Sequence, residues 1–355
     1  SKILPASQEQ YAGARNLIIN GGCTISQRGA SFADLSGYGL DRFQVGSSDD
    51  GAVTVTQDTT VPSGEGFKNS MKFDVTTADT SLGAAQFYQF FQKIEGQNVA
   101  HLMWGTSNAK SVTLSFWCRS NKTGTYNVNF MNNAADRFNP NDFTISSANT
   151  WEKKTITVSG DTTGTWLTTN GIGLYVIWNL ALGSNFDDGT NGTWGSGDYG
   201  TGNNVNWLDS TSNEFYITGV QLEVGEQATP FEHRSYADEL LKCYRYYYKT
   251  EASLGADQII GSGHISGSTL ADIFIPFLVP MRDYPTALEQ SGTASDYKIQ
   301  RAQGQVTCTA VPTFNTAHST GGNIRCTVSG GLSTGDGVRF RFGSTDSFLA
   351  WDTEL

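Results

Sequence analysis

The stretch Ser111-Val-Thr-Leu-Ser-Phe-Trp-Cys-Arg119 decides the fold class of this chain. Its apolar side chains recur at every second residue, at Val112, Leu114, Phe116 and Cys118. This period of two is expected of a strand that turns one face toward a core. After a turn at 122–124, the segment Tyr126-Asn-Val-Asn-Phe130 repeats the pattern, so both segments predict strands.

Similar strand signals lie on both sides of this stretch, at short intervals and with Gly, Asn, Asp and Ser between them. They occupy residues 17–19, 52–57, 71–75, 151–158, 171–178 and 214–224. Many short strands without a long helical period are typical of an antiparallel sandwich. We therefore expect an all-β protein, with an N-terminal arm at residues 1–15 and an antiparallel jelly-roll sandwich over residues 16–232.

The composition agrees with a sheet-and-turn protein. Of the 355 residues, 40 are glycine and only 16% are charged, against about 25% in an average domain. The net charge of −11 argues against a nucleic-acid partner, because phosphate binding needs a basic surface. The longest apolar run, Ile273–Met281, is broken by prolines and is too short for membrane insertion. The first residues, Ser1–Pro5, lack an apolar signal-peptide core, so we expect synthesis in a cytoplasm.

The pattern of alternating strand and turn residues ends near Pro230. Ser235 can cap a helix, so we expect a connector at residues 233–249 with a short helix at about 234–243. A second, smaller β-sandwich is expected at residues 250–355, with strands near 257–260, 270–277, 305–311, 324–328, 338–342 and 348–352. In the connector, four side chains recur at the spacing seen where helices pack together: Tyr236, Leu240, Cys243 and Tyr247. This stripe predicts a homotrimer, or else docking of the connector on the jelly roll.

Sequence motifs for catalysis are absent. No nucleophile elbow, phosphate-binding loop or dinucleotide fingerprint occurs in its required setting, and the four histidines have no ligand spacing. We therefore expect no catalytic residues, no enzyme activity and no cofactor. The five cysteines contain no CxxC, and for Cys308 and Cys326 both a disulfide and two free buried thiols stay open.

The long segment Gly183–Asn206 carries the best binding signal. Loops of this length are uncommon unless they are functional or disordered. Aromatic faces stack on the C–H groups of sugars, while Asp and Asn bind sugar hydroxyls. The candidate glycan-binding residues are Trp194, Tyr199, Trp207, Asp187, Asp188, Asp198, Asn203 and Asn204.

Two alternatives remain open for this segment. Its aromatic side chains can instead fold inward as anchors of the loop. The acidic run that starts at Asp187-Asp188 is either a hydrated turn or a structural Ca²⁺ site. The other tryptophans, which lie in or beside predicted strands, are expected in the core: Trp104, Trp117, Trp151, Trp166 and Trp178.

Several segments together resemble bacteriophage tail-fibre and virion structural proteins. Three segments resemble the N-terminal part of proteins of that family: Asn16-Leu-Ile-Ile-Asn-Gly-Gly22, Gln27-Arg-Gly29 and Tyr38-Gly-Leu-Asp-Arg-Phe43. The match continues at Lys93–Gly96, Leu102–Gly105 and Ser111–Trp117, and its most specific parts are Phe215–Gly225 and Ala228–Tyr236. The connector Glu239–Lys249 and the segments Val279–Arg282 and Leu349–Leu355 resemble the rest.

This resemblance implies a jelly roll similar to carbohydrate-binding modules, followed by a smaller β domain, in a virion assembled in the host cytoplasm. It implies contacts with other virion or tail proteins and with a host surface glycan, and assembly as a homotrimer. The related sandwiches often hold Ca²⁺ with an Asp in the last strand, but Ile217-Thr-Gly-Val220 has none. The leading hypothesis is a non-enzymatic phage tail protein that binds host polysaccharide during adsorption. A purely structural decoration or adaptor protein and a depolymerase are the alternatives.

Overall fold

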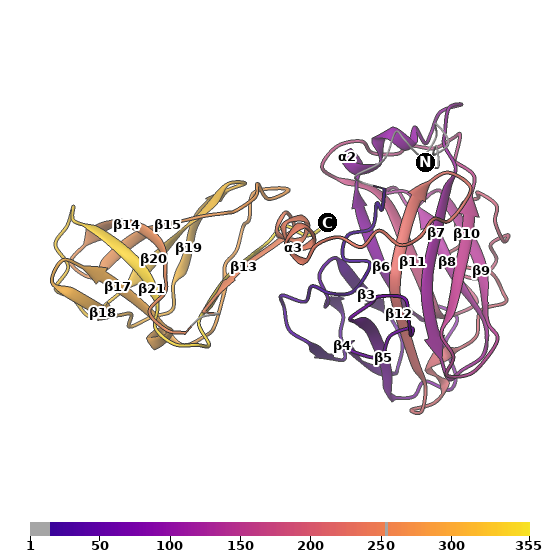
Figure 1. Cartoon of the computed structure of the whole chain (residues 1–355), viewed down its shortest axis with the longest axis horizontal. Coiled ribbons are helices and arrows are strands. Elements are labelled where there is room, and N and C mark those ends of the chain that lie inside the picture. Colours follow the sequence, from indigo (N-terminus) through magenta and orange to yellow (C-terminus); the bar gives the residue numbers. More distant parts are fainter. Residues whose placement is uncertain (1–14, 253–254) are drawn as a thin grey trace. The chain divides into compact units, whose positions relative to one another are not determined.

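The computed structural model describes residues 15–252 and 255–355 (Figure 1). Apart from Arg15, the arm expected at 1–15 lies outside the described residues. The chain forms two compact units, one extending to Glu239 and including Leu355, the other running from Leu240 to Glu354. The sequence-based boundary at 249/250 falls inside strand β13 (Tyr247–Glu251) of the second unit.

The N-terminal unit is a sandwich of two six-stranded antiparallel sheets. The first sheet has, in spatial order, β1 (Ser31–Ala33), β4 (Ala52–Asp58), β5 (Ser70–Thr77), β12 (Glu214–Val224), β7 (Val112–Ser120) and β10 (Glu152–Val158). The second sheet has β2 (Gly37–Tyr38), β3 (Phe43–Ser47), β6 (Phe87–Glu95), β11 (Ile172–Leu182), β8 (Gly124–Met131) and β9 (Phe138–Ile145). The all-β jelly-roll prediction is confirmed.

Aromatic side chains from the two sheets meet in the core of this sandwich. Phe90 of β6 and Trp178 of β11 stack with ring centroids 5.2 Å apart. Phe116 of β7 meets Trp178 edge-on at 5.8 Å, and Phe73 of β5 lies 4.6 Å from Phe90. All four side chains are completely buried. Because burial of each such side chain contributes about 1.5–3 kcal/mol, the alternating apolar residues of these strands hold the sheets together.

Two strands of the second sheet have no alternating pattern and were not predicted. Strand β6 reads FYQFFQKIE and lies between β3 and β11, and nearly all of its residues are buried. A strand covered on both faces needs no polar alternation. Strand β9 contains Pro140 between Asn139 and Asn141, which resembles a turn. Because β9 is the edge strand of its sheet, a proline is tolerated there.

The helix expected in the connector is α3 (Tyr236–Tyr244). Ser235 caps it: the Asp238 N–H donates to Ser235 Oγ at 3.1 Å, and that hydroxyl donates to the Asp238 carboxylate at 2.6 Å. The prediction that Tyr236, Leu240, Cys243 and Tyr247 lie along one face of a single helix is wrong, because the helix ends before Tyr247. Tyr247 is buried in β13 and Cys243 is buried too, whereas Tyr236 is 65% exposed.

The strand expected at residues 17–19 is wrong, because the structure has an irregular segment with a bend there. Arg234 joins the start of the connector to this segment. Its guanidinium donates to the backbone carbonyl groups of Asn16 and Ile18, the latter at 3.2 Å. It also pairs with Glu232 at 2.8 Å and with Glu239 at 3.3 Å. The bonds to Asn16 and Ile18 join residues more than two hundred positions apart in the chain, so the connector begins as part of the N-terminal unit.

The C-terminal unit consists of a seven-stranded and a three-stranded sheet. The larger has the order β18 (Gly304–Thr307), β17 (Tyr297–Arg301), β21 (Gly337–Phe342), β14 (Ile259–Gly267), β15 (Leu270–Pro276), β20 (Gly321–Thr327) and β19 (Thr313–His318). The smaller has β13, β22 (Phe348–Asp352) and β16 (Glu289–Gln290). Trp351 of β22 packs directly on Gly322 of β20, where an added Cβ would lie 2.7 Å from its indole ring, so the two sheets face each other.

Cys308 and Cys326 are buried free thiols in the core of this second unit. Burial, together with the neighbouring Cys308 thiol, raises the pKa of Cys326 well above its ordinary value. A thiol in such surroundings is unreactive. Of the two alternatives left open by the sequence, the structure has the pair of free thiols. Within the described ranges, no helix has the length and apolar character that would let it span a bilayer.

Candidate functional site

The loop between β11 and β12, which contains the predicted site, is hydrogen-bonded to residues of strands β8 and β9; Figure 1 shows where these strands lie in the sandwich. Asp142 of β9 organises much of it. The Asp142 carboxylate accepts hydrogen bonds from Thr201 Oγ1 at 2.6 Å and from Asn203 Nδ2 at 2.9 Å. Asn127 of β8 donates to the same carboxylate at 3.3 Å. A half-exposed carboxylate thus anchors the middle of a glycine-rich loop.

Aromatic rings anchor the same loop. Tyr199 lies edge-on against Phe138 of β9 at 5.3 Å and against Phe186 at 5.6 Å. Its backbone carbonyl accepts a hydrogen bond of 2.8 Å from Asn179 Nδ2 of β11. Tyr199 therefore acts as an anchor, which is the alternative that the sequence left open.

Residues 191–195 run along the free edge of β9. Phe138 and Gly195 exchange two backbone hydrogen bonds of 2.9 and 2.8 Å, and the Gly192 N–H donates to the Pro140 carbonyl at 2.7 Å. The Asp142 N–H donates to Asn191 Oδ1 at 3.0 Å. This pairing covers a sheet edge that would otherwise be open, and it fixes the backbone on both sides of Trp194.

Trp194 belongs to a group of three indole rings, which we call the tryptophan triad: Trp104, Trp166 and Trp194. Each pair meets edge-on, with centroids 4.7, 5.3 and 5.4 Å apart. Each Nε1–H donates to a backbone carbonyl, of Lys110 at 2.8 Å, Thr163 at 3.1 Å and Ser159 at 2.8 Å respectively. The orientations of the three rings are therefore set by the surrounding loops.

A small polar pocket of about 190 Å³ lies beside Trp194. Asp188 and Asp198 line it, together with the hydroxyl-bearing residues Thr193 and Ser196. Partial burial raises the pKa of Asp198, and the negative charges of Asp188 and Asp187 raise it further. We call this site the acidic pocket. It presents an indole ring, carboxylates and hydroxyl groups to one small volume.

The structure separates the predicted glycan-binding residues into two groups. Trp194, Asp188 and Asp198 line the acidic pocket, with Asp187 close enough to affect Asp198. The others, which lie outside the pocket lining, are Tyr199, Asn203, Asn204 and Trp207.

Among the second group, the amide of Asn203 is used to hold the loop, and Asn204 Nδ2 donates to the carbonyl of Val205 at 3.0 Å. Trp207 is completely buried and packs against Tyr88 at 6.2 Å. Its ring has no face open to a ligand, because it enters the sandwich core at the end of the loop. We leave it out of the proposed site.

No group of three Asp, Glu, His or Cys side chains suited to hold a metal ion is found among residues 15–252 and 255–355. Asp187 and Asp188 lie in the loop as half-buried and exposed side chains, respectively. The Ca²⁺ site considered for this run stays a prediction and enters no step below.

Trp104 and Trp166, which lie beside the site, were predicted from the sequence to be core residues. Trp104 is 7% exposed, but Trp166 is a half-buried loop residue and not a core residue. Trp117 and Trp151 are half-buried as well, so only Trp104 and Trp178 are buried as expected. The sequence around Trp166 could have placed it in a loop, because the run Gly160–Gly171 is rich in glycine and threonine.

No protein-family model and no curated protein matches the sequence. Among solved structures, the chain is similar to the enzymatically active domain of tailspike protein 4 of bacteriophage CBA120, with 14% identity and a TM-score of 0.32 over 59% of this chain and 21% of that chain. It is similar to TmCBM61 in complex with β-1,4-galactotriose, with 10% identity and a TM-score of 0.30 over 60% of this chain and 100% of that chain.

A third similar structure is the family 11 carbohydrate-binding module of the cellulase Lic26A-Cel5E of Clostridium thermocellum. It has 10% identity and a TM-score of 0.28, over 56% of this chain and 96% of that chain. The function proposed below rests on the residues of this chain.

Proposed function

We propose that this chain is a non-enzymatic protein of a phage virion, a tail fibre or tail-associated protein, that binds a host cell-surface polysaccharide through the acidic pocket. The observation that carries the proposal is the Trp194 indole held beside Asp188 and Asp198. A sugar ring has an apolar face that stacks on an indole and hydroxyl groups that donate to carboxylates. The sequence resemblance described above supports the virion context and localisation.

The ordered backbone around Trp194 also supports binding. The bridge between Phe138 and Gly195 and the Nε1 bond to Ser159 hold the ring in place before any ligand arrives. A site formed in advance loses little conformational entropy when it binds.

The test is binding of the full-length protein to an array of bacterial surface polysaccharides. Trp194→Ala should weaken binding by roughly fivefold or more, which is the loss expected of an aromatic contact of about 1 kcal/mol. Trp151→Ala is the matched control, because Trp151 is another half-buried indole and lies beside Tyr216 on β12, 6.1 Å away. Equal binding by the two variants, both folded, would contradict the site.

A purely structural role in the virion is the alternative, and failure to bind any polysaccharide would favour it. Hydrolysis is a third outcome, because a carboxyl group with a raised pKa beside a second carboxylate is also the arrangement of glycosidases. Release of reducing ends from a bound polysaccharide, abolished in Asp198→Asn, would overturn the non-enzymatic proposal.

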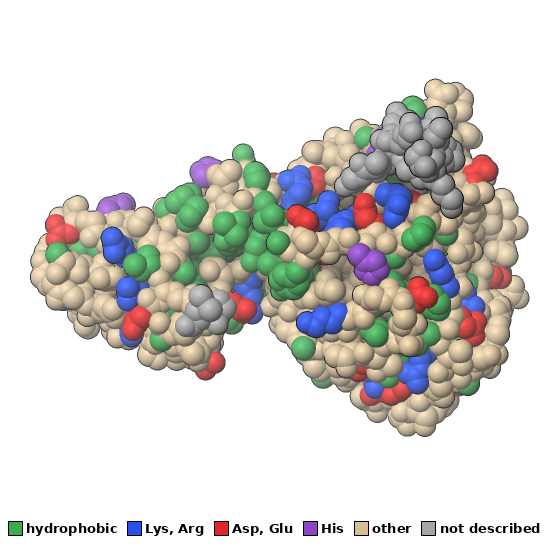
Figure 2. Space-filling model, viewed as in Figure 1, with side chains coloured by type: hydrophobic (Ala, Val, Ile, Leu, Met, Phe, Trp, Pro, Cys, Tyr) green, Lys and Arg blue, Asp and Glu red, His purple; other side chains and the backbone are tan. Residues whose placement is uncertain are grey.

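We propose a homotrimer as the assembled form. Large apolar side chains are exposed on the C-terminal unit (Figure 2), among them Phe274 at 49%, Leu278 at 69% and Tyr284 at 63%. Exposed apolar groups of this kind are typical of surfaces that bind other protein subunits. Light scattering of the purified protein should give three times the chain mass, and a monomer at micromolar concentration would contradict the proposal.

A further inference from the structure

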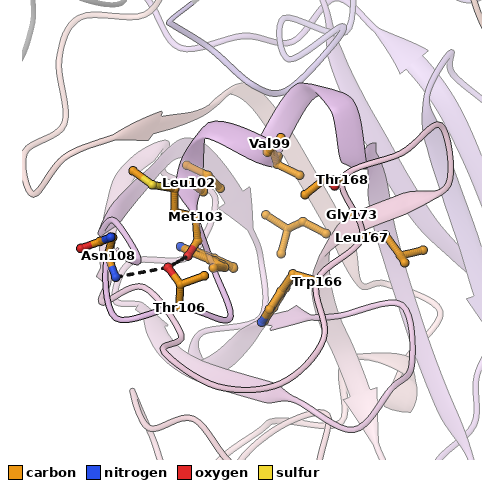
Figure 3. A pocket seen from close by; sticks show the side chains of 12 residues that line it. Val99, Leu102, Met103, Thr106, Asn108, Trp166, Leu167, Thr168 and Gly173 are labelled. Atoms are coloured by element: carbon orange, nitrogen blue, oxygen red, sulfur yellow. Dashed lines mark hydrogen bonds between the residues drawn. The ribbon is translucent and has the colours of Figure 1, made fainter.

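A second pocket, with a volume of about 320 Å³, lies next to the tryptophan triad (Figure 3). It is bounded by α2 (Gly96–Val99), by the 3₁₀ helix η1 (Ala100–Leu102) with the segment that follows it, and by the loop between β10 and β11. Its lining includes Leu102, Trp104, Trp166 and Leu174 and contains no Asp, Glu, His, Lys or Arg. We call it the apolar pocket.

Polar groups occur only in part of this lining. Thr106 and Asn108 lie together on one side and Thr168 lies on another (Figure 3). All three residues are exposed, and Thr106 Oγ1 donates to the Met103 carbonyl at 2.7 Å while it accepts from the Asn108 N–H at 3.2 Å. The Thr168 hydroxyl is therefore a group that a bound molecule can reach at the rim, whereas the Asn108 side chain points away from the cavity (Figure 3).

The indole N–H groups of the pocket do not face a ligand. Trp104 and Trp166 both donate to backbone carbonyl groups of their own loops. The rings therefore present carbon atoms to the pocket. Because burying an unpaired charge is costly, a lining without charged groups favours an uncharged and mostly apolar occupant.

Asp161 fixes the walls of the apolar pocket through two groups, its carboxylate and its backbone carbonyl. Asp161, 2% exposed, accepts two hydrogen bonds from the Arg137 guanidinium, at 2.7 and 2.9 Å. Its backbone carbonyl accepts from the Gly105 N–H at 2.8 Å. This joins the loop that carries Trp166 to the segment that carries Trp104, so the pocket exists without a ligand. Its volume lies at the lower end of the about 300–1,000 Å³ of small-molecule sites, which suits one substituted ring.

The apolar pocket is connected to the acidic pocket through the triad. Trp104 and Trp166 line the first, Trp194 lines the second, and the rings of all three are in contact. We propose that the apolar pocket binds an acetylated sugar unit, with the acetyl methyl group against the indoles and its carbonyl oxygen at the Thr168 hydroxyl. This inference rests on the proposed function, since the unit would belong to the polysaccharide bound beside Trp194.

Acetylation suits this pocket for a physical reason. An acetyl group is uncharged, has an apolar methyl group and carries one strong hydrogen-bond acceptor. The Thr168 hydroxyl supplies a donor for that acceptor, whereas a carboxylated or aminated sugar would bring a charge into a lining that cannot neutralise it. The acetamido and the acetyl-ester forms share this chemistry.

The test uses the full-length protein and matched glycans that differ only in an acetamido or acetyl-ester group in place of a hydroxyl. The acetylated member of a pair should bind about tenfold more tightly, the range for one extra small group in a hydrophobic pocket. Ala100→Trp, at an exposed residue of the lining, should fill the pocket and abolish this preference. Gln97→Trp, on the neighbouring exposed turn and outside the lining, is the matched control and should keep it.

The outcomes separate this inference from the proposed function. Equal affinity for both members of every pair overturns the acetyl site and leaves polysaccharide binding intact. If no polysaccharide binds, the proposed function fails, and the pocket is tested with methyl 2-acetamido-2-deoxyglucoside by saturation-transfer NMR. Transfer to the acetyl methyl group that is lost in Ala100→Trp supports the site, and absence of transfer overturns it. Should Ala100→Trp fail to fold, Thr168→Arg at the exposed rim serves in its place.

Discussion

The two loops that carry the half-buried members of the tryptophan triad are held in different ways. The loop between β10 and β11, with Trp166, is fastened by the buried ion pair of Arg137 and Asp161. The loop between β11 and β12, with Trp194, is fastened by neutral donors that converge on the half-exposed Asp142 and by packed aromatic rings. The first loop has an ion pair among its attachments, in addition to backbone bonds such as that of Gly105, and the second is held around Trp194 by neutral groups.

The two pockets differ in chemistry as well. The ion pair satisfies its charges within itself, and the lining of the apolar pocket contains no charged side chain. The acidic pocket has the carboxylates of Asp188 and Asp198 in its lining, and the anchoring carboxylate of Asp142 lies outside it.

The largest expected loss of stability follows a substitution at the buried end of the β11–β12 loop. Trp207→Ala leaves a cavity in the sandwich core and should lower the free energy of unfolding by about 3–5 kcal/mol. Thermal or urea unfolding measures this loss. Trp194→Ala, at a half-buried ring, is the comparison and should cost less. Equal losses would mean that Trp194 is as much a core residue as Trp207.

Removal of the ion pair is expected to have the next largest effect. Asp161→Asn should destabilise the protein by about 2–3 kcal/mol, below the ~3–5 kcal/mol of a fully buried pair because Arg137 keeps part of its exposure to solvent. Hydrogen exchange should increase around Trp166 and Arg137, since the Asp161 carboxylate joins their two segments. The Gly105 N–H keeps its bond to the backbone carbonyl of residue 161. Unchanged stability would show that the pair does not hold this loop.

Removal of the other anchor should cost less. Asp142→Ala deletes the acceptor of Thr201 and Asn203, with a loss of about 1–2 kcal/mol expected from two or three partly exposed hydrogen bonds. The change should be local, with faster hydrogen exchange in residues 199–204 and unchanged exchange around Trp166. A loss as large as that of Asp161→Asn would remove the distinction between the two loops.

The smallest expected effect is a pH dependence that belongs to the ion pair. Burial alone would raise the pKa of Asp161, but the hydrogen bonds from Arg137 and Thr163 outweigh it and hold the pKa below its usual 3.8. The unfolded chain therefore takes up the proton first as the pH falls. The difference in melting temperature between the unaltered protein and Asp161→Asn should be constant from pH 7 to about 5 and should shrink below about pH 4. A difference that grows in acid would contradict this sign.

Several features could be predicted from the sequence because they depend on neighbouring residues. The alternation in Ser111–Arg119 is a local consequence of the two faces of a strand, and the structure has β7 there. Ser235 and Asp238 cap α3 within one turn. The length and composition of Gly183–Asn206 mark it as a special loop, and Trp194, Asp188 and Asp198 of that loop line one pocket.

What only the tertiary structure decided is which distant residues meet. Trp104, Trp166 and Trp194 come from three separate connections between strands, and no spacing in the sequence relates them. Strand β6 shows no alternation because side chains on both of its faces are buried: Phe90 and Ile94 lie in the sandwich core, and Phe91 lies in a second apolar cluster. The residues that bury them come from distant parts of the chain. Trp194 and Trp207 have the same side chain near the same loop, yet one lines a pocket and the other is buried. Burial depends on what the rest of the chain places around a side chain, and a local pattern does not contain that information.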